Sequence, residues 1–365
     1  MNKAMKFRIY PNEEQKVQFE KTFGCCRFLY NKMLEDKIRE YEKNKKMIFV
    51  TPAQYKGEYP WLKEIDSLAL ANVQLHLERA YKNFFKQPSC GFPKFKSKHR
   101  GSKSYTTNVV NGNIKVMQGS LKLPKLSPVK IKLHRLIPSM YKLKSVTISK
   151  EPSGKYYASL LYTYESQVSK EKSDIENAVG IDFAMKGMAV FSSGERGEYP
   201  MFYKKAEKKL AREQRRLSKC KRGSKNYYKQ KKKVSFCHEK IRNQRKDFHH
   251  KLSTKIVNKY DVVSVENLHM RDMSGTLHLG KCVMDHGYGS FIQMLSYKLE
   301  DRGKILVKVD KYYPSSKICS SCGKIKDKLP LSERTYSCTC GNRMDRDINA
   351  AINIREEGKR LLLAS

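Results

Sequence analysis

Two closely spaced pairs of cysteines near the end of the sequence constrain this chain more than any other feature. The first pair is Cys319 and Cys322, and the second is Cys338 and Cys340; a glycine follows each pair. A Cys-x-x-Cys spacing places two thiolates on one turn, so that both can reach a single tetrahedral zinc ion. The glycines permit the backbone turns that such a knuckle needs. The sequence therefore predicts a zinc ribbon over residues 317–341.

Two disulfides, or four unrelated buried thiols, are the alternatives to a zinc site. The chain opens with no recognisable secretory signal, so we expect a reducing cytoplasm, which argues against disulfides. The second pair is one residue tighter than the usual spacing, and this weakens the match to a ribbon. The remaining cysteines lack paired spacing, and we interpret them as ordinary core or surface thiols: Cys25, Cys26, Cys90, Cys220, Cys237 and Cys282.

Charge is the second constraint. The chain has 75 Lys and Arg against 36 Asp and Glu, a formal net charge of +39. Such a surface repels itself unless a polyanion neutralises it, and phosphate backbones do so with release of counterions. A membrane surface would also attract it, but no stretch approaches the ~20 consecutive apolar residues of a membrane span. Since 39% of the residues are hydrophobic, we expect a folded nucleic-acid-binding protein.

Two helices are predicted early in the chain. Asn12 and Gln15 have the spacing of a capping box, which opens a helix that continues towards Lys45. The second helix starts at Asp66 or Ser67, and apolar residues recur along it at helical spacing. Its apolar stripe is expected in the core: Leu70, Val73, Leu77, Ala80 and Phe84. Polar residues off the stripe either contact a ligand or form a solvated surface: Gln74, His76, Arg79 and Lys82.

Residues 88–165 change to short alternating runs separated by turns, which is the pattern of short strands. Together with residues 1–11 they predict a small β-barrel, and residues 12–87 form a helical insertion between its early strands. The polar stretch 166–176 is expected to be a linker to a second domain.

Three acids stand at the ends of structural elements in the second half. Apolar strands are predicted to end in Asp182 and Glu266, and Asp347 is predicted to open a helix after the ribbon. Strand ends that lie side by side in one sheet bring their side chains together. Carboxylates that lie so near to one another repel each other unless divalent cations neutralise them. Mg²⁺ or Mn²⁺ suits such oxygen ligands. Two such ions support phosphoryl displacement, so we expect a metal-dependent phosphodiester hydrolase.

A basic helical hairpin is predicted between the first two acids. Residues 204–251 contain 20 Lys and Arg against four acids, with a turn near Gly223 and Ser224. Because the excess is of one sign, contact with phosphates is favoured over salt bridges among the side chains. Candidate contacts within the hairpin, residues 203–251, are Lys208, Arg212, Arg215, Arg216, Lys231 and Lys232.

Three motifs around these acids resemble the catalytic motifs of the RuvC-type nuclease in the TnpB family. They are Gly180-Ile181-Asp182, Val265-Glu266-Asn267-Leu268, and the run from Asp345 to Asn353. TnpB proteins are transposon-encoded and related to the type V CRISPR effectors. In the third motif the resemblance assigns the catalytic role to Asp347, with Asp345 in a supporting role. Ala184 stands where the family often has glycine, but this removes no chemical group, so we expect an active enzyme.

The resemblance implies a division of labour between two parts of the chain. A wedge-like barrel and its helical recognition insertion would hold a transposon-end-derived guide RNA and read a short motif beside the target. A RuvC-like domain of RNase H fold, residues 177–316 and 342–365, would cut both strands of the matching DNA. Base pairing would supply the sequence specificity. The protein is expected to be a monomer within a ribonucleoprotein. We expect it in the cytoplasm of a prokaryotic cell, associated with the nucleoid.

Three other functions are weighed against this one. An RNA-guided repressor without cleavage would lack one of the acids, and all three are present. A compact CRISPR effector shares the chemistry and differs in the source of its guide, which a neighbouring repeat array would reveal. A DNA-joining transposase would need strand-transfer activity, which a joining assay on transposon ends would detect.

Overall fold

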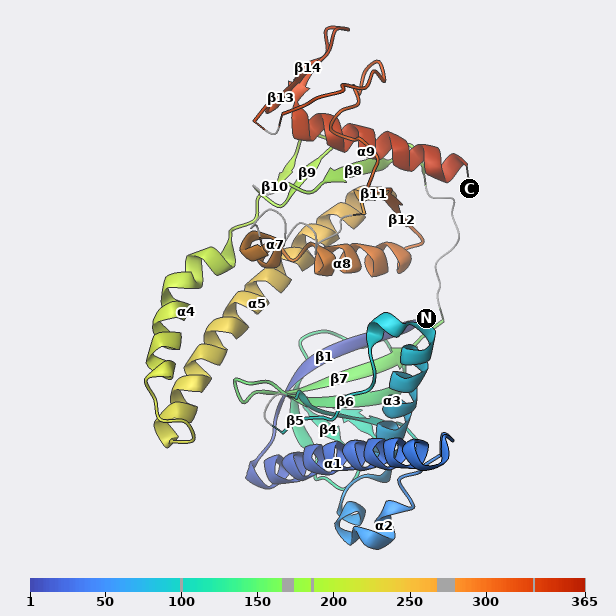
Figure 1. The fold of residues 1–365 in the computed structure, drawn as a ribbon, viewed down its shortest axis with the longest axis vertical. Coiled ribbons are helices and arrows are strands. Elements are labelled where there is room, and N and C mark those ends of the chain that lie inside the picture. The colour runs from blue at the N-terminus through green and yellow to red at the C-terminus, as the bar shows by residue number, and fades with distance from the viewer. Residues whose placement is uncertain (99–100, 166–173, 185–186, 268–279, 331, 365) are drawn as a thin grey trace. The chain divides into compact units, whose positions relative to one another are not determined.

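In the computed structural model the chain forms two compact units, Met1–Glu165 and Ser166–Ser365 (Figure 1). The structure describes residues 1–98, 101–165, 174–184, 187–267, 280–330 and 332–364. Most of the expected linker 166–176, and Leu268 of the second acidic motif, lie outside the described residues. The fold is mixed α/β, as predicted. No described helix is long and apolar enough to span a bilayer.

A seven-stranded antiparallel sheet forms the centre of the first unit, in the order β2-β6-β7-β1-β5-β4-β3. The described pairings run from β2 at one edge to β3 at the other and do not join these two, so closure into a barrel stays a prediction. The strands are β1 (Asn2–Tyr10), β2 (Lys103–Asn108), β3 (Lys115–Met117), β4 (Ser120–Lys122), β5 (Val129–Lys132), β6 (Lys142–Lys150) and β7 (Tyr156–Thr163).

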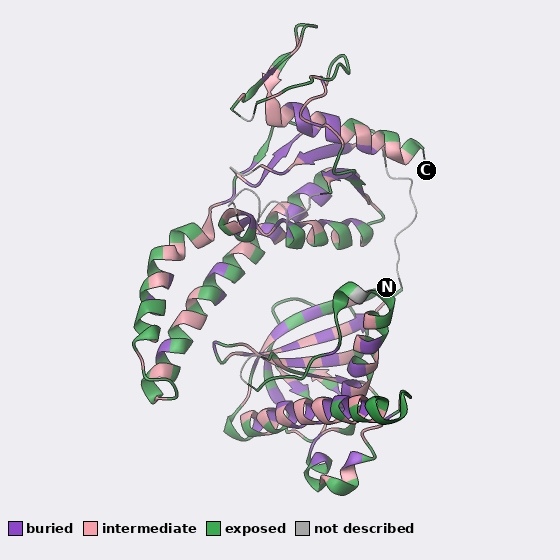
Figure 2. Cartoon of the chain, viewed as in Figure 1, coloured by how far each residue is buried: buried purple, intermediate pink, exposed green. Residues whose placement is uncertain are grey.

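Side chains of the central strands alternate between the core and the opposite face. Every second residue of β7 is buried, and Met5, Phe7 and Ile9 of β1 are buried in the same way (Figure 2). Two helices complete the core, α1 (Glu13–Asn44) and α3 (Ser67–Lys86). The alternation explains why the sheet keeps its register, because a shift by one residue would expose its apolar side chains.

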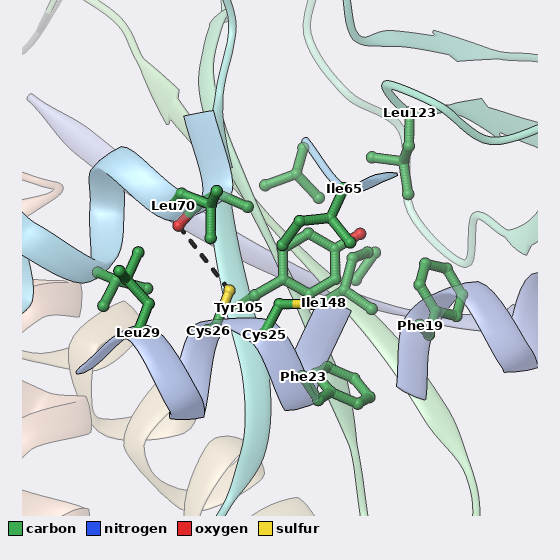
Figure 3. Close-up of a cluster of buried hydrophobic side chains, with 14 of the residues drawn as sticks. Phe19, Phe23, Cys25, Cys26, Leu29, Ile65, Leu70, Tyr105, Leu123 and Ile148 are labelled. Carbon is green, nitrogen blue, oxygen red and sulfur yellow. Dashed lines mark hydrogen bonds between the residues drawn. The ribbon is translucent and has the colours of Figure 1, made fainter. Parts of the chain in front are cut away.

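The predicted capping box of α1 is confirmed. The Asn12 side chain accepts a hydrogen bond from the Gln15 amide at 2.8 Å, and the Asn12 amide donates to the Gln15 side chain at 3.0 Å. Asp66 caps α3. Figure 3 shows apolar side chains of α1, including Phe19, Phe23 and Leu29, gathered with side chains of α3 and of the sheet.

The predicted stripe of α3 is correct in its first part only. Leu70, Val73 and Leu77 are buried, whereas Ala80 and Phe84 are half-buried and Tyr81 enters the core. The shift arises at the end of the helix, where Tyr81 and Phe84 both contact the ring of Phe92 edge-on. The short helix α2 (Tyr55–Glu58) and the 3-10 helix η1 (Pro60–Glu64) precede α3, and the 3-10 helix η2 (Pro88–Cys90) follows it.

A five-stranded sheet in the order β10-β9-β8-β11-β12 forms the centre of the second unit. Strands β8, β11 and β12 are parallel, β9 pairs antiparallel with β8, and β10 pairs antiparallel with β9. The first four residues of β8 and of β11 are all buried, as expected for strands covered on both faces. The strands are β8 (Ala178–Asp182), β9 (Ala189–Phe191), β10 (Arg196–Gly197), β11 (Val262–Glu266) and β12 (Ile305–Val309).

Helices cover both faces of this sheet (Figure 1). Val179 and Ile181 of β8, with Val263 and Val265 of β11, pack in one cluster with residues of α5 (Lys225–Lys259) and α8 (Tyr288–Glu300). The intervening residues of both strands face α9 (Arg346–Leu363). The predicted hairpin is present as α4 (Phe202–Ser218) and α5, with Ser224 capping α5. The remaining elements are α7 (Gly280–His286), β13 (Thr335–Ser337) and β14 (Arg343–Asp345).

Two glycines let α9 lie directly on the sheet. A Cβ atom at Gly180 of β8 would overlap the backbone of Ala351 and Arg355 in α9. A Cβ atom at Gly358 of α9 would overlap the side chain of Ser264 in β11. Backbone atoms of a packed helix cannot turn aside as a flexible side chain can. Any larger residue at Gly180 must therefore displace α9.

Gly180→Ala should lower the free energy of unfolding of the second unit by about 1–3 kcal/mol, because overpacking forces backbone shifts. Urea unfolding of the full chain, followed by circular dichroism, measures the effect. Gly289→Ala in α8 is the matched control, since a Cβ atom there meets no atom within 4 Å. That control should change stability by at most about 1 kcal/mol, in the stabilising direction. Equal effects of the two variants would contradict the close packing of α9.

Candidate active site and metal-binding ribbon

Asp182 and Glu266 are the last residues of two neighbouring parallel strands. Ile181 of β8 pairs with Val265 of β11, so the two acids follow at the same edge of the sheet. Side chains alternate along a strand, and both acids therefore lie on the face of the sheet that α9 covers. Both are half-buried. The predicted convergence of these two strand ends is thus present in the structure.

Asp347 reaches the same face from the first turn of α9. The prediction that Asp347 opens the helix needs correction: α9 begins at Arg346, and Asp345 is the residue that caps it. The Asp345 carboxylate accepts hydrogen bonds from the amides of Asp347 at 3.0 Å and Ile348 at 3.2 Å. A capping carboxylate satisfies amides that have no partner within the helix. Asp345 therefore fixes the turn that carries Asp347.

The three acids affect one another electrostatically. Burial, followed by the charges of Asp347 and Glu266, raises the pKa of Asp182 to about 7. Burial also raises the pKa of Glu266. Among the described residues, the three carboxylates do not form a set with all ligand atoms within 4.8 Å, as the four ribbon cysteines do. The three acids surround a negatively charged site, which a bound cation would stabilise.

Arg196 of β10 is a site residue that sequence reasoning missed. One nitrogen of its guanidinium group lies 2.8 Å from Oδ2 of Asp345, and another lies 3.9 Å from Oδ2 of Asp347. The arginine thus connects the edge of the sheet with the start of α9. No local pattern could have revealed this pair, because Arg196 and Asp345 are 149 residues apart in the sequence.

The four predicted ribbon cysteines come together, and all of their sulfur atoms lie within 4.8 Å of one another. Cys319 and Cys340 are 3.7 Å apart, as are Cys322 and Cys338. Four sulfurs at about 2.3 Å from one tetrahedral ion would be about 3.8 Å apart, so the arrangement fits such an ion. All four are free thiols. The tight second pair does not prevent convergence.

The environment of Cys319 favours its thiolate form. Burial alone would raise the pKa of Cys319, but the Asn342 side chain and the amides of Cys322 and Ser321 lower it to about 6. The Asn342 amide nitrogen lies 3.4 Å from the Cys319 sulfur. Thiolates rather than thiols bind metal ions, so Cys319 has a side chain suited to act as a metal ligand.

Two buried asparagines of α9 hold the ribbon against the helix. The Asn349 side chain donates to the Ile318 carbonyl at 2.7 Å and accepts from the Ser320 amide at 3.0 Å. The Asn353 side chain donates to the carbonyls of Ile318 and Ser315, each at 2.7 Å. The first cysteine knuckle is therefore fixed to the helix that carries Asp347. Both asparagines belong to the third acidic motif, but the sequence predicted no contact for them.

The predicted nucleic-acid contacts lie on three helices, α3 of the first unit and α4 and α5 of the second. On α3, Gln74 is half-buried, and His76, Arg79 and Lys82 are exposed. Burial, then the charges of Lys96 and Arg79, lowers the pKa of His76. All six hairpin candidates are exposed on α4 and α5: Lys208, Arg212, Arg215, Arg216, Lys231 and Lys232. Arg212 and Arg216 approach Glu213 at 3.6 and 3.5 Å, so these two are partly neutralised.

Three protein families match parts of the chain. The family described as "Probable transposase" matches residues 161–277, which include the strands ending in Asp182 and Glu266. The family described as "Cas12f1-like, TNB domain" matches residues 288–354, which include the ribbon and the start of α9. A third, described as "Helix-turn-helix domain", matches residues 1–46, where the structure has one strand and one helix, β1 and α1.

Relatives align along nearly the whole chain. A Streptomyces pristinaespiralis protein named "Putative RNA-guided DNA endonuclease" is 34% identical over 368 residues, 98% of this chain and 90% of the relative. The Escherichia coli (strain K12) protein "Putative RNA-guided DNA endonuclease InsQ" is 30% identical, with 98% and 93% covered. A solved "Cas12f1-sgRNA-target DNA complex" has a TM-score of 0.62 over 97% of this chain and 98% of that one. At 14% identity, this likeness concerns the fold.

Identity of 34% over nearly the full length of both chains defines the class, that of transposon-associated proteins named as RNA-guided DNA endonucleases. The chain belongs to the TnpB family. The family resemblance inferred from the three acidic motifs is thereby confirmed.

Asp345→Ala should destabilise the second unit by about 1 kcal/mol, because the helix loses its cap. Asp345→Asn keeps an oxygen that can cap the helix and loses only the ion pair with Arg196. That pair is partly exposed, so its loss should cost at most about 1 kcal/mol. Thermal unfolding of both variants, followed by circular dichroism, compares the two contributions. An alanine variant as stable as the wild type would contradict the capping role.

Proposed function

We propose that this chain is an RNA-guided DNA endonuclease of a mobile element, which cuts double-stranded DNA beside a short adjacent motif. The observation that carries the proposal is that Asp182 and Glu266 end neighbouring strands on the face covered by α9, whose first turn contains Asp347. Membership of the TnpB family, whose relatives bear the name RNA-guided DNA endonuclease, supports it. The charge of +39 supplies the affinity for nucleic acid.

The second unit is proposed to be a RuvC-like nuclease of RNase H fold. Its sheet has the strand order β10-β9-β8-β11-β12, and β8, β11 and β12 are parallel. This topology supports the proposal. Asp182 and Glu266 lie at the carboxyl ends of β8 and β11, and α9 packs across these two strands. For the first unit, the seven-stranded sheet and its helices support a wedge-like domain that contacts the guide RNA.

The acids fit Mg²⁺ or Mn²⁺, because they supply hard oxygen ligands in a crowded, partly buried position. Asp182, Glu266 and Asp347 would hold the ions. Bound there, two divalent cations would stabilise the attacking and leaving oxygens of an in-line phosphodiester displacement. Asp345 holds the first turn of α9 in place, and Arg196 limits the repulsion between Asp345 and Asp347. These two residues act through position rather than through the reacting atoms.

The ribbon is proposed to bind one Zn²⁺ through Cys319, Cys322, Cys338 and Cys340. Its role is structural, because four thiolates close the coordination sphere and leave no position for a substrate. The asparagine contacts transmit the order of the ribbon to α9. Loss of the ion would therefore disturb Asp347, although Asp347 is not a ligand of that ion.

Asp182→Ala, Glu266→Ala and Asp347→Ala should each reduce cleavage by at least about 100-fold, since a catalytic metal site contributes several kcal/mol to the transition state. RNA and target binding should remain within a few-fold of wild type. Single-turnover cleavage and filter binding of the same complexes measure the two quantities. Asp345→Ala should reduce cleavage less than Asp347→Ala. The reverse order would overturn the assignment of the third acid.

Cys319→Ser should lower the zinc content and the cleavage rate together, whereas Cys90→Ser, outside the ribbon, should change neither. Asn349→Ala should keep all four thiols and their zinc but lose the link to α9, so cleavage falls while zinc content stays. Elemental analysis and cleavage assays on the purified complex measure both. Folded wild-type protein with well under one zinc per chain would refute the ribbon site.

The guide prediction concerns the source of sequence specificity. Purified complex should contain a defined RNA, and a change in only its 3′ segment should redirect the cut, because base pairing reads the target. The requirement for the same adjacent motif should persist, since the protein reads that motif. Sequencing of cut ends with two guides tests both statements. Specific cutting by RNA-free protein, unchanged when RNA is added, would refute the proposed function.

A further inference from the structure

A pocket lies between helices α4 and α5, and the proposed function assigns it no role. It has a volume of about 520 Å³ and is lined by residues of both helices. We call it the hairpin pocket and define it by Lys205, Lys209, Phe202, Phe236 and Lys240, with their neighbours. Sites for small ligands commonly have volumes of ~300–1,000 Å³. The hairpin pocket is therefore large enough for one nucleotide.

Four lysines line the hairpin pocket, Lys205 and Lys209 from α4 and Lys233 and Lys240 from α5. None of the four forms an ion pair with a carboxylate in the part of the chain that the structure describes. Of the acids of α4, Glu207 pairs with Lys281 at 2.9 Å, whereas the charge of Lys233 contributes to lowering the pKa of Glu213. Such a cluster of like charges is stabilised by an anion, and Lys is a common ligand of phosphate.

Apolar residues complete the lining of the hairpin pocket. Phe202, Ala206 and Ile241 belong to it, and Phe236 is 41% exposed, with the Lys232 ammonium 5.9 Å from its ring centroid. Glu213 also lines the pocket, but its carboxylate accepts a hydrogen bond from Gln230 at 2.7 Å, which holds it in place. An aromatic ring at the edge of a basic pocket is the combination that binds single-stranded nucleic acid, because every base has a flat face that can stack.

We infer that the hairpin pocket binds one unstacked base of the guide RNA, with the base against Phe236 and the adjacent phosphates on the four lysines. This inference rests on the proposed function, which supplies an RNA partner. Structured RNA presents unpaired bases in loops and bulges, and proteins recognise RNA mainly there. A base of duplex DNA would first have to leave its stack at a cost in free energy. RNA is therefore the favoured occupant.

Salt dependence separates the two parts of the hairpin pocket. Lys209→Ala and Lys233→Ala should each reduce the slope of log affinity against log salt by about 0.7, as for one lost phosphate contact with a single strand. Phe236→Ala should lower affinity by about 5- to 100-fold at every salt concentration and leave the slope unchanged, because stacking is not ionic. The full chain and its own co-purified RNA, measured by filter binding, give both quantities.

Tyr228→Ala is the matched control for the aromatic residue. Tyr228 is 59% exposed on the same helix and does not line the hairpin pocket. Its loss should change affinity by less than about twofold. If Tyr228→Ala and Phe236→Ala cost the same, general exposure rather than the pocket explains the binding, and the inference is wrong. Lys229→Ala serves in the same way for the lysines, and it should change the slope less than Lys209→Ala.

Cys237 reports directly on occupancy, because it lines the hairpin pocket. Its alkylation by a maleimide should be at least about tenfold slower in the RNA complex than in RNA-free protein, and the Phe236→Ala complex should lose much of this protection. Protection that arises only when target DNA is added would overturn the RNA assignment. Unprotected Cys237 in a complex that still performs guided cutting would refute the pocket alone. A protein without defined RNA or guided cutting would refute the proposed function.

Discussion

The close approach of helix α9 to strands β8 and β11 is the constraint on which the second unit depends. Gly180 meets the backbone of α9 with no side chain of its own, and Gly358 leaves room for the side chain of Ser264. Because side chains alternate along a strand, the residues two positions beyond Gly180 and Ser264, which are Asp182 and Glu266, face the helix. The packing that brings α9 to the sheet therefore also brings Asp347 to Asp182. One steric condition sets both the core and the site.

Charge is organised on two scales in this chain. Around the acids, two of the described cations have specific partners: Arg196 contacts Asp345 and approaches Asp347, while Arg346 lowers the pKa of Asp182 against the larger effect of burial. Along α4 and α5 the cations are numerous and exposed. The first arrangement orders carboxylates, and the second presents positive charge to the solvent. The net charge of +39 does not distinguish the two arrangements.

Local patterns in the sequence predicted the elements, the capping box, the ribbon cysteines and the hairpin, because each depends on residues close together in the chain. Contacts between distant segments were not predictable. Arg196 had no signal, and Asn349 and Asn353 have partners that depend on the path of the ribbon. The sequence predicted Asp347 at the start of the helix, and only the hydrogen bonds identify Asp345 as its cap. Tyr81 displaces Ala80 from the core of α3 for a tertiary reason, its contact with Phe92.

The packing of Ala351 on Gly180 also joins segments about 170 residues apart. Contacts between such distant residues form late, because the intervening chain must first be ordered. During synthesis, β8 leaves the ribosome long before α9 exists, so the third acid cannot join the first two until almost the whole chain is made. An unfinished or C-terminally truncated chain would already carry the basic hairpin. It would bind nucleic acid without a complete set of acids.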